Sequence, residues 1–372
     1  MHFARAPLAV ALLFVLAAGD LGAQQKKKKP GSDDEGYVPV VAPDSKDKKK
    51  KDETQTLPAP PELPSTVSAE TNRLAFQVSP LSSRGLLSQQ TRDALKSLLK
   101  TNHGTIVKLR AFVAGSGDLR RVGELVGEIF TEKRQPLPAL SVVQVGALPQ
   151  EGAQVVIEST ETDKKVVNPS GVAFLSGQPA ATVAESLAKL KGVLAAAGMQ
   201  PSDVLIATCF VSSLDSQRDT QATMAAAFPG AALNYVQMQR EPVTPAAACE
   251  ARARLTKPAA SIDSQAALIS TAELVITGTQ LAFGAQDTDL KLAFDRLEKA
   301  LAARSARLDH VAVSHLYVTS NGLATRVLAA HAARFGPHPP SNTLLPVEGL
   351  PSLDAPLGIE VIATPDSSTA QR

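Results

Sequence analysis

Three charged residues alternate along one short apolar stretch, and these side chains could do chemistry. Glu250, Arg252 and Arg254 are separated by alanines, so a β-strand would place all three on one face. A carboxylate can move a proton or position water, and a guanidinium beside it can bind a substrate carboxylate bidentately. We expect Arg252 or Arg254 to bind an anion beside Glu250. The alternative is a charged edge strand whose side chains are solvated or salt-bridged.

The other reactive residue types show no comparable pattern. Apart from His2, the histidines lack the spacing of a metal site, and surface or pocket-lining roles are expected for His103, His310, His315, His331 and His338. Neither a phosphate-binding glycine loop nor a nucleophile elbow occurs in the sequence. The sequence therefore predicts no metal and no nucleotide cofactor.

Charge is unevenly distributed along the chain. Residues 1–59 hold ten basic and eight acidic residues, and the remainder holds equal numbers of each. A nucleic-acid-binding domain usually concentrates positive charge on its folded part, so this function is disfavoured. The hydrophobic fraction is 44% and Trp is absent, so the core must consist mainly of aliphatic residues.

The N-terminus resembles a secretory signal peptide. Arg5 precedes an apolar run at residues 7–18, and Leu21-Gly22-Ala23 is a plausible cleavage site, so residues 1–23 are predicted to be removed on export. We expect a secreted or periplasmic protein without stable membrane insertion. Because the run is short for a bilayer span, an uncleaved anchor is the less favoured alternative.

Residues 24–66 are rich in Lys and Pro and are predicted to be a disordered tether. The alternative is that the lysines bind an anionic membrane surface.

The rest of the chain repeats itself three times. Phe76, Phe112 and Phe130 recur 98 residues later as Phe174, Phe210 and Phe228, and the 18-residue spacing returns between Tyr317 and Phe335. Repeats are predicted at residues 67–162, 163–258 and 259–372. Each has the order strand, helix, strand, helix, strand, strand, with apolar helix stripes such as Leu187, Leu190 and Leu194. Each sheet would carry two helices on one face and bury its other face against the other repeats.

Short sequence motifs in each repeat resemble those of the RidA (YjgF) family of enamine and imine deaminases. Residues 174–178 (FLSGQ) match that family's F-x-S-G-Q, residues 138–145 (PALSVVQV) are similar to its P-A-R-S-x-V-x-V, and residues 274–280 (LVITGTQ) begin the third copy. The resemblance covers residues 67–365. It implies three chorismate-mutase-like α/β units arranged as an intrachain pseudo-trimer, acting as a monomer, with ligand pockets between units and no metal or cofactor.

The resemblance also implies which residues should act, and here the chain departs from the family. The position of the carboxylate-binding Arg falls at Leu140, Leu233 and Asn342. The position of the acid falls at Val156, Glu250 and Gly358. A helix Asn common in the family falls at Gly123, Gln221 and Leu328. The candidate residues that remain are Glu250 as the acid, with ligand contacts from Ser176, Gly177, Gln178, Arg252, Gly278, Thr279, Gln280 and Asn342.

Both cysteines, Cys209 and Cys249, fall in the second copy. The resemblance places them on neighbouring strands, and alternation puts Cys249 on the helix-covered face. In an oxidising compartment they could form a disulfide, and two buried thiols are the alternative.

Two functions therefore remain open. The first is binding of a small carboxylate or imine-type ligand without catalysis, because no copy keeps the Arg. The second is a diverged 2-iminobutanoate/2-iminopropanoate deaminase with one working pocket at Glu250. The ribonuclease activity sometimes ascribed to the family is disfavoured by the neutral folded region.

Overall fold

The computed structural model describes residues 61–366, and three units with the same order of elements follow one another along it. The first unit contains β2 (Leu74–Val78), α1 (Leu87–Thr101), β3 (Gly104–Ala114), α2 (Leu119–Glu132), β4 (Ala139–Val145) and β5 (Val155–Asp163). The second contains β6 (Val172–Ala180), α3 (Val183–Ala196), β7 (Val204–Val211), α4 (Gln217–Ala227), β8 (Ala232–Gln237) and β9 (Ala247–Arg254). The third contains β12 (Glu273–Thr277), β13 (Gln280–Ala282), α5 (Asp287–Ala302), β14 (Val311–Val318), α6 (Asn321–Phe335), β15 (Ser341–Pro346) and β16 (Leu357–Ala363).

The three sheets share one strand order. With β13 of the third unit set aside, because it pairs only with β16, the last strand of each unit lies between the first and second strands, and the third strand lies outside the second. The orders are β2-β5-β3-β4, β6-β9-β7-β8 and β12-β16-β14-β15. The second and third strands are parallel, and the other pairs are antiparallel. The predicted class of three mixed α/β units is confirmed.

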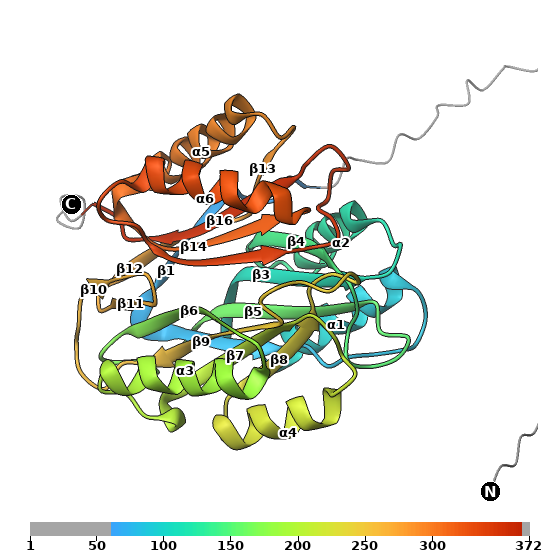
Figure 1. Ribbon diagram of the computed structural model, residues 1–372, viewed down its shortest axis with the longest axis horizontal. Helices are drawn as coiled ribbons and strands as arrows, with labels where there is room; N and C mark the ends of the chain where they lie inside the picture. The colour runs from blue at the N-terminus through green and yellow to red at the C-terminus, as the bar shows by residue number, and fades with distance from the viewer. Residues whose placement is uncertain (1–60, 367–372) are drawn as a thin grey trace, which may run out of the picture. The chain divides into compact units, whose positions relative to one another are not determined.

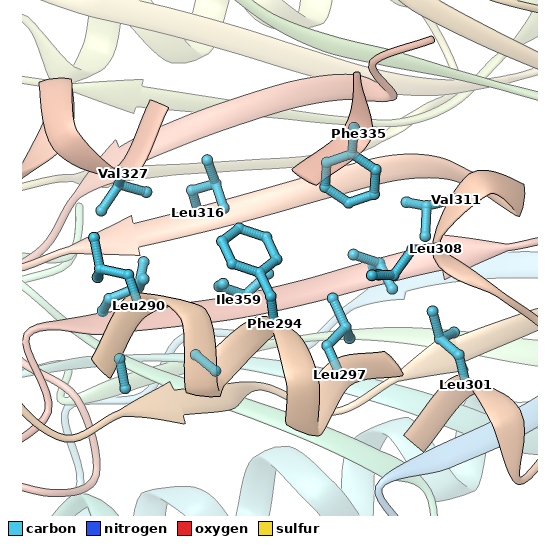
Figure 2. Packing of buried hydrophobic residues seen from close by; sticks show 14 of the residues in the cluster. Leu290, Phe294, Leu297, Leu301, Leu308, Val311, Leu316, Val327, Phe335 and Ile359 are labelled. Atoms are coloured by element: carbon cyan, nitrogen blue, oxygen red, sulfur yellow. The ribbon is translucent and has the colours of Figure 1, made fainter. Parts of the chain in front are cut away.

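Two helices cover one face of each sheet, because each helix has one apolar stripe. Figure 1 shows α5 and α6 on one side of β14 and β16, and α3 and α4 outside β6 to β9. Figure 2 shows the core of the third unit, where Phe294 and Leu297 of α5 point toward Leu316 and Ile359 of the sheet. Equivalent helix–sheet cores fill the first and second units.

The ends of α3 agree with its sequence. The hydroxyl of Thr182 accepts a hydrogen bond from the Glu185 amide at 3.2 Å, which satisfies one of the free N–H groups at the start of the helix. Gly198 follows the helix with a φ of +73°, a conformation that other residues adopt at a cost.

The units exchange their leading segments in a cycle, which the sequence did not predict. β1 (Thr66–Glu70) precedes the first unit but pairs with β12 of the third. Hairpin β10 (Ser261–Ile262) and β11 (Ala266–Ile269) precede the third unit, but β11 pairs with β6 of the second. The amides of residues 167 and 168, before the second unit, bond to Asn72 beside β2 of the first. The predicted repeat boundaries at 67, 163 and 259 assign each leading segment to the repeat that follows it in the sequence. In the structure each leading segment instead bonds to a different unit.

The inner faces of the sheets share two apolar clusters. One includes Phe112, Phe210 and Tyr317, one from each unit. The other includes Val107, Ile206 and Val313, again one from each unit. The surface that each sheet leaves uncovered by helices is thus buried against its neighbours.

Cys209 and Cys249 form a disulfide between the paired strands β7 and β9, on the helix-covered side of the second sheet. Within residues 61–366, no helix is long and apolar enough to cross a bilayer. The predicted signal peptide at 1–23 and nearly all of the predicted tether at 24–66 lie outside the described residues.

Candidate functional site

A layer of ionisable side chains, most of them charged, lies between the two shared apolar clusters. It is formed by inward-facing positions of the second and last strands, and every unit contributes at least one ionisable side chain. Its members, which we call the central charge layer, are Lys108, Arg110, Glu158, Glu250, Arg252, His315, Tyr317 and Glu360.

Glu250 lies inside this layer with both carboxylate oxygens bonded. Its Oε1 lies 2.5 Å from Nη2 of Arg110 in the first unit, and its Oε2 lies 3.0 Å from Nε2 of His315 in the third. Burial alone would raise the pKa of the Glu250 carboxyl, but Arg110 and His315 hold that pKa well below its ordinary value. Glu250 is thus ionised at neutral pH and links three units.

Glu158 of the first unit is held in the same way. Arg110 donates to its Oε2 from Nε at 3.0 Å and from Nη2 at 2.7 Å. Thr208 and Asn234 of the second unit donate to its Oε1 at 2.6 and 2.7 Å. Burial opposes ionisation, yet Arg110 and Arg252, together with the hydrogen bond from Asn234, lower the pKa of the Glu158 carboxyl.

Glu360 of the third unit completes the set. Lys108 of the first unit donates to its Oε2 at 2.6 Å, and Tyr317 donates to its Oε1 at 2.8 Å. Ser141 also donates to Oε2. Burial acts against the charge, but Lys108 and His315 lower the pKa of the Glu360 carboxyl. Burial lowers the pKa of Lys108 and raises that of Tyr317 well above its ordinary range, so the phenol stays protonated.

The structure corrects the expected alignment of Glu250 with Val156 and Gly358. Glu250 stands opposite Thr208, two residues from Phe210, whereas Val156 and Gly358 stand opposite Phe112 and Tyr317. The true counterparts of Glu250 are Glu158 and Glu360. Strand alternation does not reveal this shift, because a displacement of two residues along a strand preserves the face on which a side chain lies.

A sequence signal for these missed residues did exist. Each last strand contains a Glu directly after a buried apolar residue, as Ile157-Glu158, Cys249-Glu250 and Ile359-Glu360. A lone acid recurring inside an apolar strand predicts a buried and paired carboxylate. The partners Lys108 and His315 carry no such signal, because their contacts cross between units.

Arg252 and Arg254 do not share one environment. Arg252 lies in the central charge layer, 3.7 Å from Glu158 and 3.8 Å from Glu250. Arg254 is exposed and donates to the side chain of Asn168. The alternative of a charged edge strand is wrong about the strand, because β9 lies between β6 and β7 and is not at an edge. The salt bridges that this alternative predicted are present at Arg252.

Gly278, Thr279 and Gln280 lie in a different place, beside the first unit. A groove of about 430 Å³, which we call the interface groove, is lined by these residues, by Leu119, Arg120 and Gly123 around α2, and by Leu140 and Val142 of β4. The amide of Thr279 donates to the Leu140 carbonyl at 3.2 Å. A Cβ on Gly278 would lie 2.9 Å from that carbonyl oxygen, so only glycine permits the approach.

Ser176, Gly177 and Gln178 form the equivalent contact between the second and third units. The Gly177 amide donates to the hydroxyl of Thr343 at 2.8 Å. Ser176 donates to backbone carbonyls at Ser264 and Gln265, and Gln178 donates to the Ser176 carbonyl. These three polar groups are therefore bonded within the protein.

Asn342, which stands at the expected Arg position, accepts a hydrogen bond from Ser314 at 3.1 Å. Ser314 also lies 2.9 Å from Nε2 of His331. Burial lowers the pKa of His331 to about 4. His315 and His331 are both buried. Of the two expected roles, surface or pocket-lining, His315 has the second, because it lines a cavity of about 30 Å³ within the central charge layer, whereas His331 is not at the surface.

In the part of the chain that the structure describes, no three His, Cys, Asp or Glu side chains are placed to hold a metal ion.

Neither a protein-family model nor a curated protein matches this sequence. Solved structures match about a quarter of it. Rv2704 from Mycobacterium tuberculosis, a member of the YjgF/YER057c/UK114 family, is 27% identical over 24% of this chain and 77% of its own, with a TM-score of 0.24. Yeast Mmf1 is 21% identical over 29% and 89%, and a putative endoribonuclease from Thermotoga maritima is 21% identical over 26% and 82%, both with TM-scores of 0.24.

Proposed function

We propose that this chain is a non-catalytic small-molecule-binding protein on a RidA-like scaffold, built as a pseudo-trimer in one polypeptide. Its ligand would lie in the interface groove. The observation that carries the proposal is that Glu250, the expected catalytic acid, lies apart from the interface groove. Glu250 is buried with both oxygens engaged, and it does not line the groove that Gly278 to Gln280 form.

The groove has an apolar wall and two charged lining residues, Arg120 and Glu62, and its ligand would have an apolar body and one carboxylate that pairs with Arg120. Leu140 and Val142 supply an apolar wall where the family resemblance predicts an Arg. Arg120 lies at the start of α2, and its partner Asp118 is also exposed, so this ion pair contributes little and a ligand carboxylate can compete for it. Small aromatic or aliphatic carboxylates fit this description.

A titration followed by ¹H–¹⁵N NMR, with benzoate and 2-oxobutanoate as probes, tests the proposal. We expect saturable shifts at the amides of Gly278 to Gln280. Gly123→Leu should weaken binding at least about tenfold, because the new side chain enters the groove beside Leu140. Gly192→Leu, on α3 with open space around it, is the matched control and should bind as the parent does. Absence of shifts at the groove, or equal binding by Gly123→Leu, contradicts the proposal.

The competing function is imine hydrolysis that depends on Glu250. An imino acid generated in solution by an amino-acid oxidase supplies the substrate, and release of the oxo acid reports hydrolysis. We expect no acceleration over the uncatalysed rate. An acceleration that Glu250→Gln abolishes, in a variant shown to be folded, would replace the binding proposal with a deaminase.

Export to a secreted or periplasmic location also remains a proposal. The apolar run at residues 7–18 after Arg5 supports it. The disulfide between Cys209 and Cys249 is of the kind that persists in oxidising compartments. Mass spectrometry of the mature N-terminus tests the proposed cleavage after Ala23, and an intact N-terminus on exported protein would contradict it.

A further inference from the structure

A second cavity adjoins the interface groove. It has a volume of about 500 Å³ and lies between the first unit and the loop that joins β15 to β16 of the third. We call it the loop cavity, and its lining residues are Ser116 to Arg120, Gln144 and Leu350 to Asp354. Because Leu119, Arg120 and Pro351 line both spaces, one ligand can extend from the groove into the loop cavity past Arg120.

Backbone hydrogen bonds hold this loop in place at both of its ends. The Gln144 amide donates to the Gly349 carbonyl at 2.8 Å, and the Glu348 amide donates to the Gln144 carbonyl at 2.9 Å. Further along the loop, the Gly284 amide donates to the Asp354 carbonyl at 3.2 Å. The loop backbone is therefore ordered without a ligand, which lowers the entropic cost of binding one against it.

The charges around the two spaces favour a ligand that carries both signs. Among the lining residues are three acids, Glu62, Asp118 and Asp354, and one cation, Arg120. A purely anionic ligand would meet a net negative surround, whereas a ligand that also carries an ammonium group matches it. Of the two acids in the loop cavity, Asp118 is paired with Arg120, and Asp354 is exposed. A ligand ammonium group in the loop cavity would therefore pair with Asp354.

We propose that the interface groove and the loop cavity together bind a zwitterion of dipeptide size, with a small first residue and an apolar second residue. This inference rests on the proposed function, because it extends the same ligand site. The carboxylate of the second residue would pair with Arg120, and its apolar side chain would lie against Leu140 and Val142. The ammonium group of the first residue, about 7 Å further along an extended chain, would lie beside Asp354 in the loop cavity.

A ¹H–¹⁵N NMR titration of the full chain with glycyl-leucine tests the proposal. We expect saturable shifts at the amides of Gly278 to Gln280 and also at those of Ser352 to Asp354, whereas benzoate should shift only the first set. N-acetyl-glycyl-leucine lacks the ammonium group and should bind at least about threefold more weakly, as expected for the loss of a charge pair that is open to solvent. Leucyl-glycine has the same charges but moves the apolar side chain out of the groove, so it should also bind more weakly than glycyl-leucine.

Substitution of the acid gives the matched comparison. In Asp354→Asn, glycyl-leucine and its acetylated form should bind equally, because the ammonium group has lost its partner. Asp215→Asn changes an exposed acid of the second unit outside both spaces and should keep the parent's preference. A preference lost in Glu62→Gln and kept in Asp354→Asn would overturn the assignment of the ammonium group.

The titrations also separate this inference from the proposed function. Equal binding of glycyl-leucine and N-acetyl-glycyl-leucine to the parent, with benzoate shifts at the groove, would overturn the zwitterion proposal and leave the proposed function standing. Absence of shifts with benzoate, 2-oxobutanoate and glycyl-leucine alike would contradict both.

Discussion

Nη2 of Arg110 lies 2.5 Å from Oε1 of Glu250, although the two residues belong to different units and are 140 positions apart. Their side chains are 3% and 4% exposed. A buried ion pair of this kind is specific rather than strongly stabilising, because desolvation offsets much of the attraction. It fixes which unit lies beside which, since Arg110 has Thr208 and His315 at its equivalent positions. The three units are therefore not interchangeable.

Removal of Glu250 from this ion pair should lower the stability of the protein. Glu250→Gln leaves Arg110 and His315 without a shared counter-ion, and we expect the free energy of unfolding to fall by about 3–5 kcal/mol. Urea unfolding measures this loss. Glu298→Gln is the control, because Glu298 forms an exposed pair with Arg334 and should unfold at nearly the same urea concentration as the parent. Similar effects of the two substitutions would contradict the buried role of Glu250.

Stability should fall below pH 6.5 because of His331. Its folded pKa of about 4 lies below the ordinary value of 6.5, so the unfolded chain binds a proton that the folded chain does not between these values. Stability is therefore fully present above pH 6.5 and declines as pH falls toward 4, by about 3 kcal/mol for a shift of this size. Urea unfolding at pH 7 and pH 4.5 should show a smaller difference in His331→Gln than in the parent. The same difference in both proteins would show that another group causes the decline.

Stability should decline further at lower pH because of the acids. The pKa values of Glu158 and Glu250 are lower in the folded than in the unfolded protein, so their contribution is present above about pH 4.5 and is lost as pH falls through their folded values. Acid unfolding of Glu250→Gln should be less steep than that of the parent in this range. An identical acid transition in both proteins would show that Glu250 is not ionised in the folded state.

The disulfide should be complete in protein made in an oxidising compartment. Thiol titration in denaturant without reductant should find no free thiol, and reduction should release two, since the chain has two cysteines. The bond closes a loop across 40 residues, and we expect its replacement by two alanines to cost about 2–4 kcal/mol. Two free thiols in the unreduced protein would instead support the buried-thiol alternative.

The strand exchange predicts a position-dependent effect of truncation. A chain that begins at Pro61 keeps β1, whereas one that begins at Thr71 leaves β12 without its neighbour on that side. We expect hydrogen exchange at residues 274–277 to be faster in the shorter chain, because β1 pairs with this segment. The chain beginning at Pro61 is the matched control. Equal exchange in the two chains would show that β1 does not complete the third sheet.

The order of elements could be predicted from the sequence because it depends on local patterns. The 98-residue offset of Phe76, Phe112 and Phe130, and the stripe at Leu187 to Leu194, report the helices and strands of each unit. The faces were predictable as well, since alternation placed Cys249 toward the helices and Glu250 away from them.

The pairing between units could not be predicted in this way. Whether β11 pairs with β6 or with β12 depends on contacts that no local pattern encodes, and both choices preserve the alternation. The side chains that contact Glu250 could not be predicted for the same reason. Glu250 could be identified from the sequence, but its partners Arg110 and His315 lie in other units. The sequence therefore does not distinguish a catalytic carboxylate that faces a ligand from a carboxylate buried in ion pairs.

The most direct test of the central claim, that three units close around one shared interior, is a double-mutant cycle between Arg110 and Glu250. Urea unfolding of Arg110→Met, Glu250→Gln and the double variant gives their coupling free energy. Side chains in contact couple by about 0.5–3 kcal/mol, and we predict a value in the upper half of that range. A coupling of zero within error would mean that the first and second units do not meet at this layer, and the arrangement described for the sheets would be wrong.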